Sequence, residues 1–137
     1  MSAPDWHDLP APTLAQLEAM ADAAFARLPT SFRALCAGVV FKVDDFPDEE
    51  TLEAMGAESE FDLLGLFQGN GLAQGGGLPQ TGQGPNMIWL YRRPILDFWA
   101  EGGETLGDIV THVLVHEIGH HFGLSDADME RIEAQAG

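Results

Sequence analysis

The sequence has a single cysteine, Cys36, among its 137 residues. One cysteine excludes an internal disulfide and a zinc cage built from several thiolates. No apolar run approaches the roughly 20 residues of a membrane-spanning helix. The first residues have neither the basic nor the apolar region of a secretory signal. We therefore expect a cytoplasmic protein with no membrane partner.

Basic residues are also scarce, with six Lys and Arg against 22 Asp and Glu and a net charge of −16. No cluster of Lys and Arg is present to neutralise phosphate groups, which argues against nucleic acid and anionic membranes as partners. The imbalance is greatest in residues 44–62, which hold nine acidic side chains and no basic one. This segment predicts a solvated acidic surface; the alternative is a surface that attracts cationic partners.

What is present indicates one folded domain over residues 1–137. Hydrophobic residues make up 45% of the chain, which is enough for a core of its own. Residues 1–12 are expected to be a loose N-terminus. Residues 69–85 contain seven glycines and no hydrophobic periodicity, which predicts a long loop that is either a lid or a plain connector. This loop lacks the GK[ST] of a phosphate-binding loop.

Hydrophobic periodicity predicts an α+β chain. Helices are expected over residues 13–28, in a short acidic stretch ending near Gly56, from Pro94 to Gly102–Gly103, over residues 105–122, and from Ser125 onward. The expected strands are residues 35–43, 61–69 and 86–92, all rich in apolar and β-branched or aromatic side chains.

The stretch HVLVHEIGHHFGLSD, residues 112–126, holds four of the five histidines. His116 and His120 are four residues apart on the expected long helix, so both imidazoles can reach one ion. Two imidazoles supply half of a tetrahedral zinc site. Glu117 is rotated about 100° from His116, which places its carboxylate beside the ion as a general base for hydrolysis.

The pattern continues as HExxHxxGxxD. Gly123 can adopt a positive φ, end the helix and turn the chain back. Asp126 can then supply the third ligand, with Asp128 or Glu130 as substitutes if the turn differs, and water would hold the fourth position. The same Asp126 would also favour a helix N-terminus without any metal. His112 is expected to be a partly buried structural histidine; the alternatives are that it lines the cleft or donates a hydrogen bond to a carboxylate outside the metal shell.

These residues resemble a known family. HEIGHHFGLSD, together with LLGLFQG and IWLYRRPILDFW, is similar to the small bacterial zincin-like metallopeptidases over about residues 41–133. The resemblance implies an α+β, minimal zincin-like fold: a small mixed sheet packed on helices, with the HExxH helix near the C-terminus. It implies one zinc ion per chain held by His116, His120 and Asp126, with Glu117 as the base.

The predicted function is therefore a zinc metallopeptidase that hydrolyses a peptide or an unstructured protein, with an activity that is weak or narrow in so small a frame. By analogy with zincins, the strand NMIWLYR is expected to be the exposed edge that binds substrate. The alternative is a non-catalytic zinc-binding module that docks a partner and keeps a degenerate peptidase site. The sequence does not reveal the oligomeric state, and a monomer is one possibility.

Overall fold

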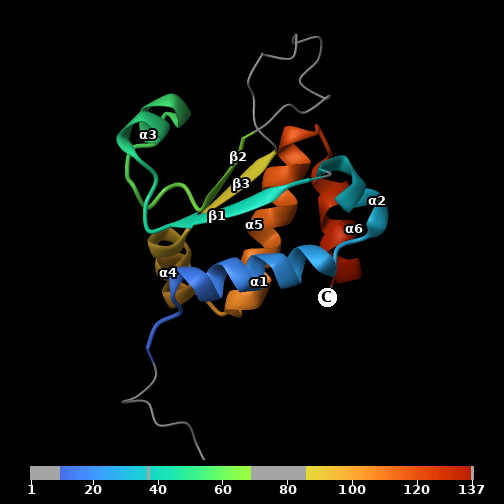
Figure 1. Cartoon of the computed structure of the whole chain (residues 1–137), viewed down its shortest axis with the longest axis horizontal. Coiled ribbons are helices and arrows are strands. Elements are labelled where there is room, and N and C mark those ends of the chain that lie inside the picture. The colour runs from blue at the N-terminus through green and yellow to red at the C-terminus, as the bar shows by residue number, and fades with distance from the viewer. Residues whose placement is uncertain (1–9, 37, 69–85, 137) are drawn as a thin grey trace, which may run out of the picture.

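The computed structural model describes residues 10–36, 38–68 and 86–136, and within them it has helices around a small sheet (Figure 1). The expected 69–85 loop and most of the expected loose N-terminus lie outside the described residues. The elements in chain order are α1 (Leu14–Ala26), α2 (Thr30–Arg33), the 3-10 turn η2 (Ala34–Cys36), β1 (Val40–Asp44), α3 (Glu49–Met55), β2 (Gly65–Gln68), β3 (Met87–Tyr91), α4 (Arg92–Glu101), α5 (Leu106–His121) and α6 (Asp126–Ala136).

Within the described residues the sheet has three strands, in the order β1-β3-β2. β1 runs parallel to β3, with Phe41 beside Ile88, and β2 runs antiparallel to β3, with Phe67 beside the same Ile88. The sheet is therefore mixed, and the fold is the α+β arrangement expected for a minimal zincin. The expectation that residues 86–92 form an exposed edge is wrong, because β3 is the central strand and is paired on both sides. The edge strands are β1 and β2.

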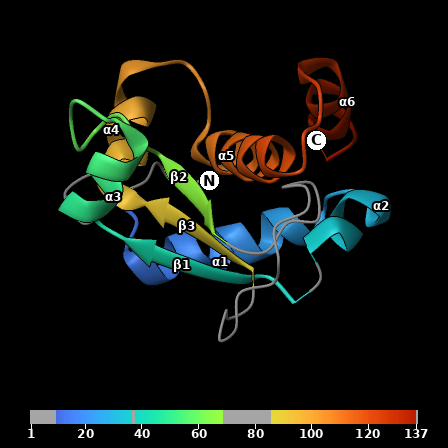
Figure 2. The ribbon, with the colours of Figure 1, turned by 90° about the horizontal axis from the view of Figure 1, so that it is seen from above.

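The core lies where α1, α5 and the sheet meet. α1 packs against both α5 and β1, while α5 also contacts β2 and α6. In Figure 1, α1 crosses α5, and Figure 2 shows α6 alongside α5 on the side away from the sheet. Fully buried side chains from these elements fill the space between them: Leu17, Ile88, Leu90, Ile95, Ile109, Leu114, Ile118 and Met129.

Local sequence signals account for most helix ends. The hydroxyl of Thr13 accepts a hydrogen bond from Gln16 N at 3.1 Å, and the side chain of Asp48 accepts one from Thr51 N at 2.7 Å. Both are N-caps that satisfy free amides of a first helical turn. Gly56 ends α3 with a φ of 67°. These helices confirm the expected ones to within two residues.

The expected strand 35–43 is shorter than predicted. Residues Leu35 and Cys36 belong to the 3-10 turn, which follows the short helix α2, and β1 begins only at Val40. Phe32 and Cys36 are buried, so this apolar stretch enters the core from a helical conformation.

Among the described residues, no helix is long and apolar enough to cross a membrane.

Gly65 lets β2 approach α5 closely. A Cβ atom at this position would lie 2.7 Å from Val113 Cγ1 and 3.0 Å from the carbonyl oxygen of Trp89. The same atom would be 3.4 Å from Glu117 Cγ. The backbone of β2 therefore covers the part of α5 that carries Glu117, and only glycine leaves room for it.

We expect Gly65→Ala to lower the free energy of unfolding by about 1–3 kcal/mol, because the added methyl must displace Val113 or the central strand. Urea denaturation measures the change. Gly107→Ala is the matched control: nothing lies within 4 Å of its Cβ position, and it sits in the exposed first turn of α5. Alanine there is expected to leave stability equal or raised. Equal stability of Gly65→Ala and wild type would contradict the close approach.

Candidate metal centre

Helix α5 carries the histidines on one face and the core on the other. Thr105 caps its start by accepting a hydrogen bond from Asp108 N at 3.1 Å. Its buried side chains recur at helical spacing and face α1 and the sheet: Ile109, Val110, Val113, Leu114 and Ile118. The residues one turn apart on another face are His112, His116 and His120. The amphipathic pattern thus aims three imidazoles away from the core.

His116 and His120 stand next to each other as the HExxH spacing predicts. Their ring centroids are 5.5 Å apart and the rings are nearly perpendicular, at 82°. His116 is partly buried, and that burial lowers its pKa, with the neighbouring His112 as the next cause. A lowered pKa keeps the imidazole neutral, which is the form that binds a metal.

The end of α5 is the predicted glycine turn. Gly123 has a φ of 74°, and Leu124 N donates to the carbonyl oxygen of Gly119 at 2.8 Å. This closes the helix in the manner of a Schellman motif and sends the chain back as α6. Ser125 accepts a hydrogen bond from Asp128 N at 3.1 Å, as expected of its cap position.

Gly119 brings α6 close to α5. A Cβ atom at Gly119 would lie 2.7 Å from Met129 Cγ and would overlap the Met129 sulfur. Met129 is fully buried, and Glu133 lies one turn further along α6 on the same face. The contact at Met129 therefore directs the carboxylate of Glu133 toward the histidine face of α5.

Glu133 meets two imidazoles there. Its Oε1 lies 3.2 Å from His116 Nε2 and 2.9 Å from His112 Nδ1. This oxygen is buried, and neither nitrogen has the direction of a hydrogen bond to it. The ligand atoms of His112, His116 and Glu133 all lie within 4.8 Å of one another, and no other such group occurs in residues 10–36, 38–68 and 86–136.

The predicted ligands are therefore brought together only in part. His116 and His120 have adjacent rings, but His120 lies outside the cluster of His112, His116 and Glu133. Asp126 is exposed at the first position of α6 and lies outside that cluster too. The negative charge of Asp126 acts to raise the pKa of His116, although burial and His112 lower it overall. The substitutes considered for Asp126 also point elsewhere: Asp128 pairs with Arg131, and Glu130 is exposed.

Glu117 is enclosed on the neighbouring side of α5. Burial raises the pKa of its carboxyl from an ordinary 4.5 to about 7. The backbone of β2 at Gly65 provides much of the cover. A carboxyl group with a pKa close to neutral can both accept and return a proton near pH 7, which is the property of a general acid–base.

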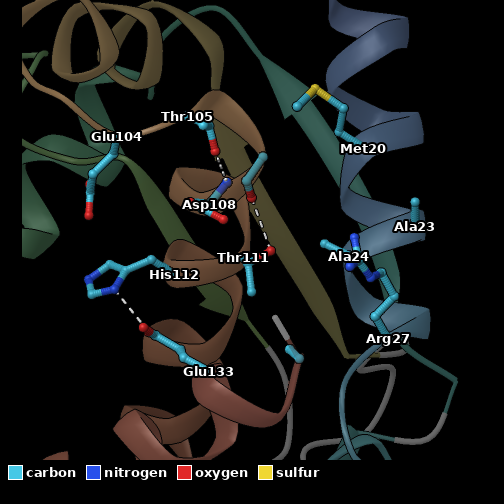
Figure 3. A pocket seen from close by; sticks show the side chains of 12 residues that line it. Met20, Ala23, Ala24, Arg27, Glu104, Thr105, Asp108, Thr111, His112 and Glu133 are labelled. Atoms are coloured by element: carbon cyan, nitrogen blue, oxygen red, sulfur yellow. Dashed lines mark hydrogen bonds and ion pairs between the residues drawn. The ribbon is translucent and has the colours of Figure 1, made fainter.

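Glu117 and His116 line a hollow of about 280 Å³ between β2, the end of α4, and α5. Asp62 and Glu104 add negative charge to its wall, and none of the described residues that line it is Lys or Arg. A second hollow, of about 600 Å³, lies between α1 and the α5–α6 pair. Figure 3 shows His112 and Glu133 pointing toward each other across from α1 in this second hollow. Glu104 and His112 line both hollows, so the two meet at these residues.

The donor set fits a zinc ion. Zinc bound to imidazole and carboxylate at about 2.0–2.1 Å in a tetrahedron separates its ligand atoms by about 3.3 Å. The 3.2 Å between His116 Nε2 and Glu133 Oε1 is close to that edge length. The contact lacks hydrogen-bond direction, and the buried Oε1 is left without a well-directed donor among the described residues. Imidazole and carboxylate are also ligands that zinc prefers.

Sequence reasoning missed Glu133 and Gly65. The available signal for Glu133 was its spacing of four from Met129, which puts both on one face of α6, but the pairing of that face with α5 depends on packing. His121 and Tyr91 are ordinary parts of the fold. His121 stacks on Phe67 with centroids 4.0 Å apart, and Tyr91 is buried, which raises its pKa to about 12.

The sequence model of the zincin-like metallopeptidase family matches residues 36–136, which is most of the chain and includes every residue of the centre. No curated protein matches the chain significantly.

The burial of Glu117 makes a prediction for the protein kept free of metal by a chelator. Because its pKa is raised on folding, its contribution to stability is present at low pH and is lost as pH rises from 4.5 through about 7. Glu117→Gln cannot lose a proton. Relative to wild type, the variant should therefore gain up to about 3 kcal/mol of stability between pH 5 and pH 8.

Urea denaturation of both proteins across this pH range measures the difference in their free energies of unfolding. Contributions from the other titrating groups are common to both proteins and cancel in this difference. A difference that stays constant with pH would contradict a buried carboxyl at position 117.

Proposed function

The chain belongs to the zincin-like metallopeptidase family, and on that premise we propose that it is a zinc-dependent peptidase with one zinc ion per chain. The observation that carries the proposal is the arrangement on α5. A carboxyl with a pKa of about 7 lies next to a pair of imidazoles and lines the same hollow as one of them. Metal binding alone does not require that carboxyl.

His116 and His120 would hold the zinc together with a carboxylate from α6. Two residues qualify as the third ligand. Asp126 is the one the HExxHxxGxxD pattern predicts, and Glu133 is the one whose oxygen lies 3.2 Å from His116 Nε2. The partial burial of Glu133 and its contact favour it, because Asp126 is exposed and would have to leave the surface of the first turn of α6.

The proposed chemistry divides between the ion and Glu117. When bound, zinc would supply a Lewis acid that polarises the scissile carbonyl and makes water more acidic. Glu117 would accept the proton of the attacking water and donate it to the leaving amine. The dry surroundings that β2 and Val113 give Glu117 favour both transfers, because a pKa near the working pH leaves the carboxyl able to accept and to donate.

We propose an extended peptide, or an unstructured segment of a protein, as the substrate. Strand β2 is an edge of the sheet, and its first residue, Gly65, lines the hollow that contains Glu117. A peptide can pair with such an edge through its main chain. The carboxylates of Asp62 and Glu104 and the net charge of −16 favour substrates with basic side chains near the cleaved bond.

The alternative is a zinc-binding module that docks a partner without cleaving it. All nine acidic residues between positions 44 and 62 are exposed, which is compatible with such a docking surface. Asp45 among them already pairs with Arg92 at 3.0 Å. The raised pKa of Glu117 has no role in docking, so the peptidase remains the better supported function.

We expect Glu117→Gln to keep the zinc but to lower the cleavage rate of unstructured peptides by about 10²–10⁴-fold, because the proton acceptor is lost. A peptide library digested by wild type and by the variant, with metal analysis of both, measures this. The library also reports any preference for basic residues. Glu130→Gln, an exposed carboxylate on α6, is the control and should cleave as wild type does.

Zinc retention with no cleavage by either protein would favour the docking module. Absence of zinc from both, even after its addition, would rule out the centre.

The third ligand is tested by comparing Glu133→Ala with Asp126→Ala. Loss of the ligand should weaken zinc binding by at least about 10–100-fold, measured by competition with a chelator. We expect this loss for Glu133→Ala and only a small change for Asp126→Ala. The reverse result would restore Asp126 as the ligand and make Glu133 a neighbour of the site. Circular dichroism of each variant checks that α6 is still formed.

A further inference from the structure

His112 lies one turn before His116 on the same face of α5. Half of its side chain is exposed, and its ring centroid is 3.9 Å from that of His116, with the planes tilted by 30°. It is not part of the HExxH pattern. Its Nδ1 nevertheless approaches the same carboxylate oxygen that His116 approaches, the Oε1 of Glu133.

The direction of this approach indicates a ligand and not a hydrogen-bond donor. A histidine that only held Glu133 in place would donate a well-directed N–H bond to it. His112 Nδ1 comes within 2.9 Å of Oε1 without that direction, and the buried oxygen has no such bond from any described residue. Three lone-pair atoms converge, with edges of 2.9 and 3.2 Å, not far from the roughly 3.3 Å of a tetrahedral zinc shell.

We propose that His112 is a fourth, displaceable protein ligand of the zinc ion. This inference rests on the proposed function, in which His116, His120 and a carboxylate hold the ion. With His112 added, the four tetrahedral positions are all taken by protein, as in a structural zinc site, and none is left for water or substrate. The resting protein is then closed, and catalysis requires that His112 leave the ion.

The position of His112 suits this role. It lies at the meeting point of the two hollows, with Glu104 as the other residue that lines both. A substrate that runs from the Glu117 hollow into the second one must pass His112. The half-exposed side chain borders the larger hollow, which provides open space for it to turn into. On this proposal, a substrate that binds across the two hollows displaces His112 and so opens the metal site.

The ligand set can be read directly in protein loaded with ¹¹³Cd in place of zinc. Heteronuclear NMR correlates the metal with the ring protons of each bound histidine. We expect correlations to His116, His120 and His112 in the protein without substrate. Addition of acetohydroxamate, a small bidentate metal ligand, should remove the His112 correlation and keep the other two.

The outcomes separate the two proposals. Correlations to His116 and His120 alone would overturn the role of His112 and leave the proposed metal centre standing. Absence of any histidine correlation would overturn the centre itself.

Zinc affinity provides the second readout. His112→Ala and His112→Gln should both weaken zinc binding by about tenfold or more, since neither side chain replaces an imidazole as a ligand. Glutamine can still donate a hydrogen bond to Glu133, so wild-type affinity in His112→Gln would show that His112 only positions Glu133. Glu104→Gln is the matched control, because it alters the same junction without removing an imidazole. Equal weakening in Glu104→Gln and His112→Ala would also overturn the proposal.

Discussion

The close contact of Gly119 with Met129 is the constraint on which the centre depends. Gly119 lies inside the HExxH pattern, at a position that contributes no ligand. Its lack of a side chain determines how closely α6 can approach α5. With α6 held there, Glu133 reaches the histidine face. Gly65 plays the equivalent part on the sheet side, where it brings β2 over Val113 and Glu117. The two glycines thus let neighbouring elements approach α5 on two sides. On one side α6 brings Glu133 to the histidines, and on the other β2 covers Glu117.

Much of the fold could be predicted because its signals are local. Thr13, Asp48 and Thr105 each cap a helix within three residues of themselves, and Gly56 and Gly123 end helices through positive φ values. The order of the strands could not be predicted in this way. The apolar sequence of residues 86–92 is compatible with either an edge strand or a central strand. β3 is central because β1 and β2, which come from other parts of the chain, pair with it on both sides.

The candidate site, like the fold, could be predicted only where its signals are local. His116, Glu117 and His120 follow from spacing on one helix, and the helix forms where its caps indicate. The partner of His116 does not follow, because it depends on the angle between two helices and on which turn of α6 faces α5. Asp126 is the nearest acid beyond the glycine turn, whereas Glu133 is two turns later and is placed by Met129. Burial raises the pKa of Glu117, and one of the segments close to its side chain is the backbone at Gly65, more than 50 residues earlier in the sequence.

All side chains that approach the proposed ion come from one helical hairpin, α5 and α6, within residues 106–136. Contacts so close in sequence form early in folding, whereas Gly65 of β2 lies more than 50 residues before Glu117 in the sequence. Under the proposed function, the hairpin can bind its ion before the sheet covers Glu117. Metal capture and the burial of Glu117 would then belong to different stages of folding, because the second of them depends on the sheet.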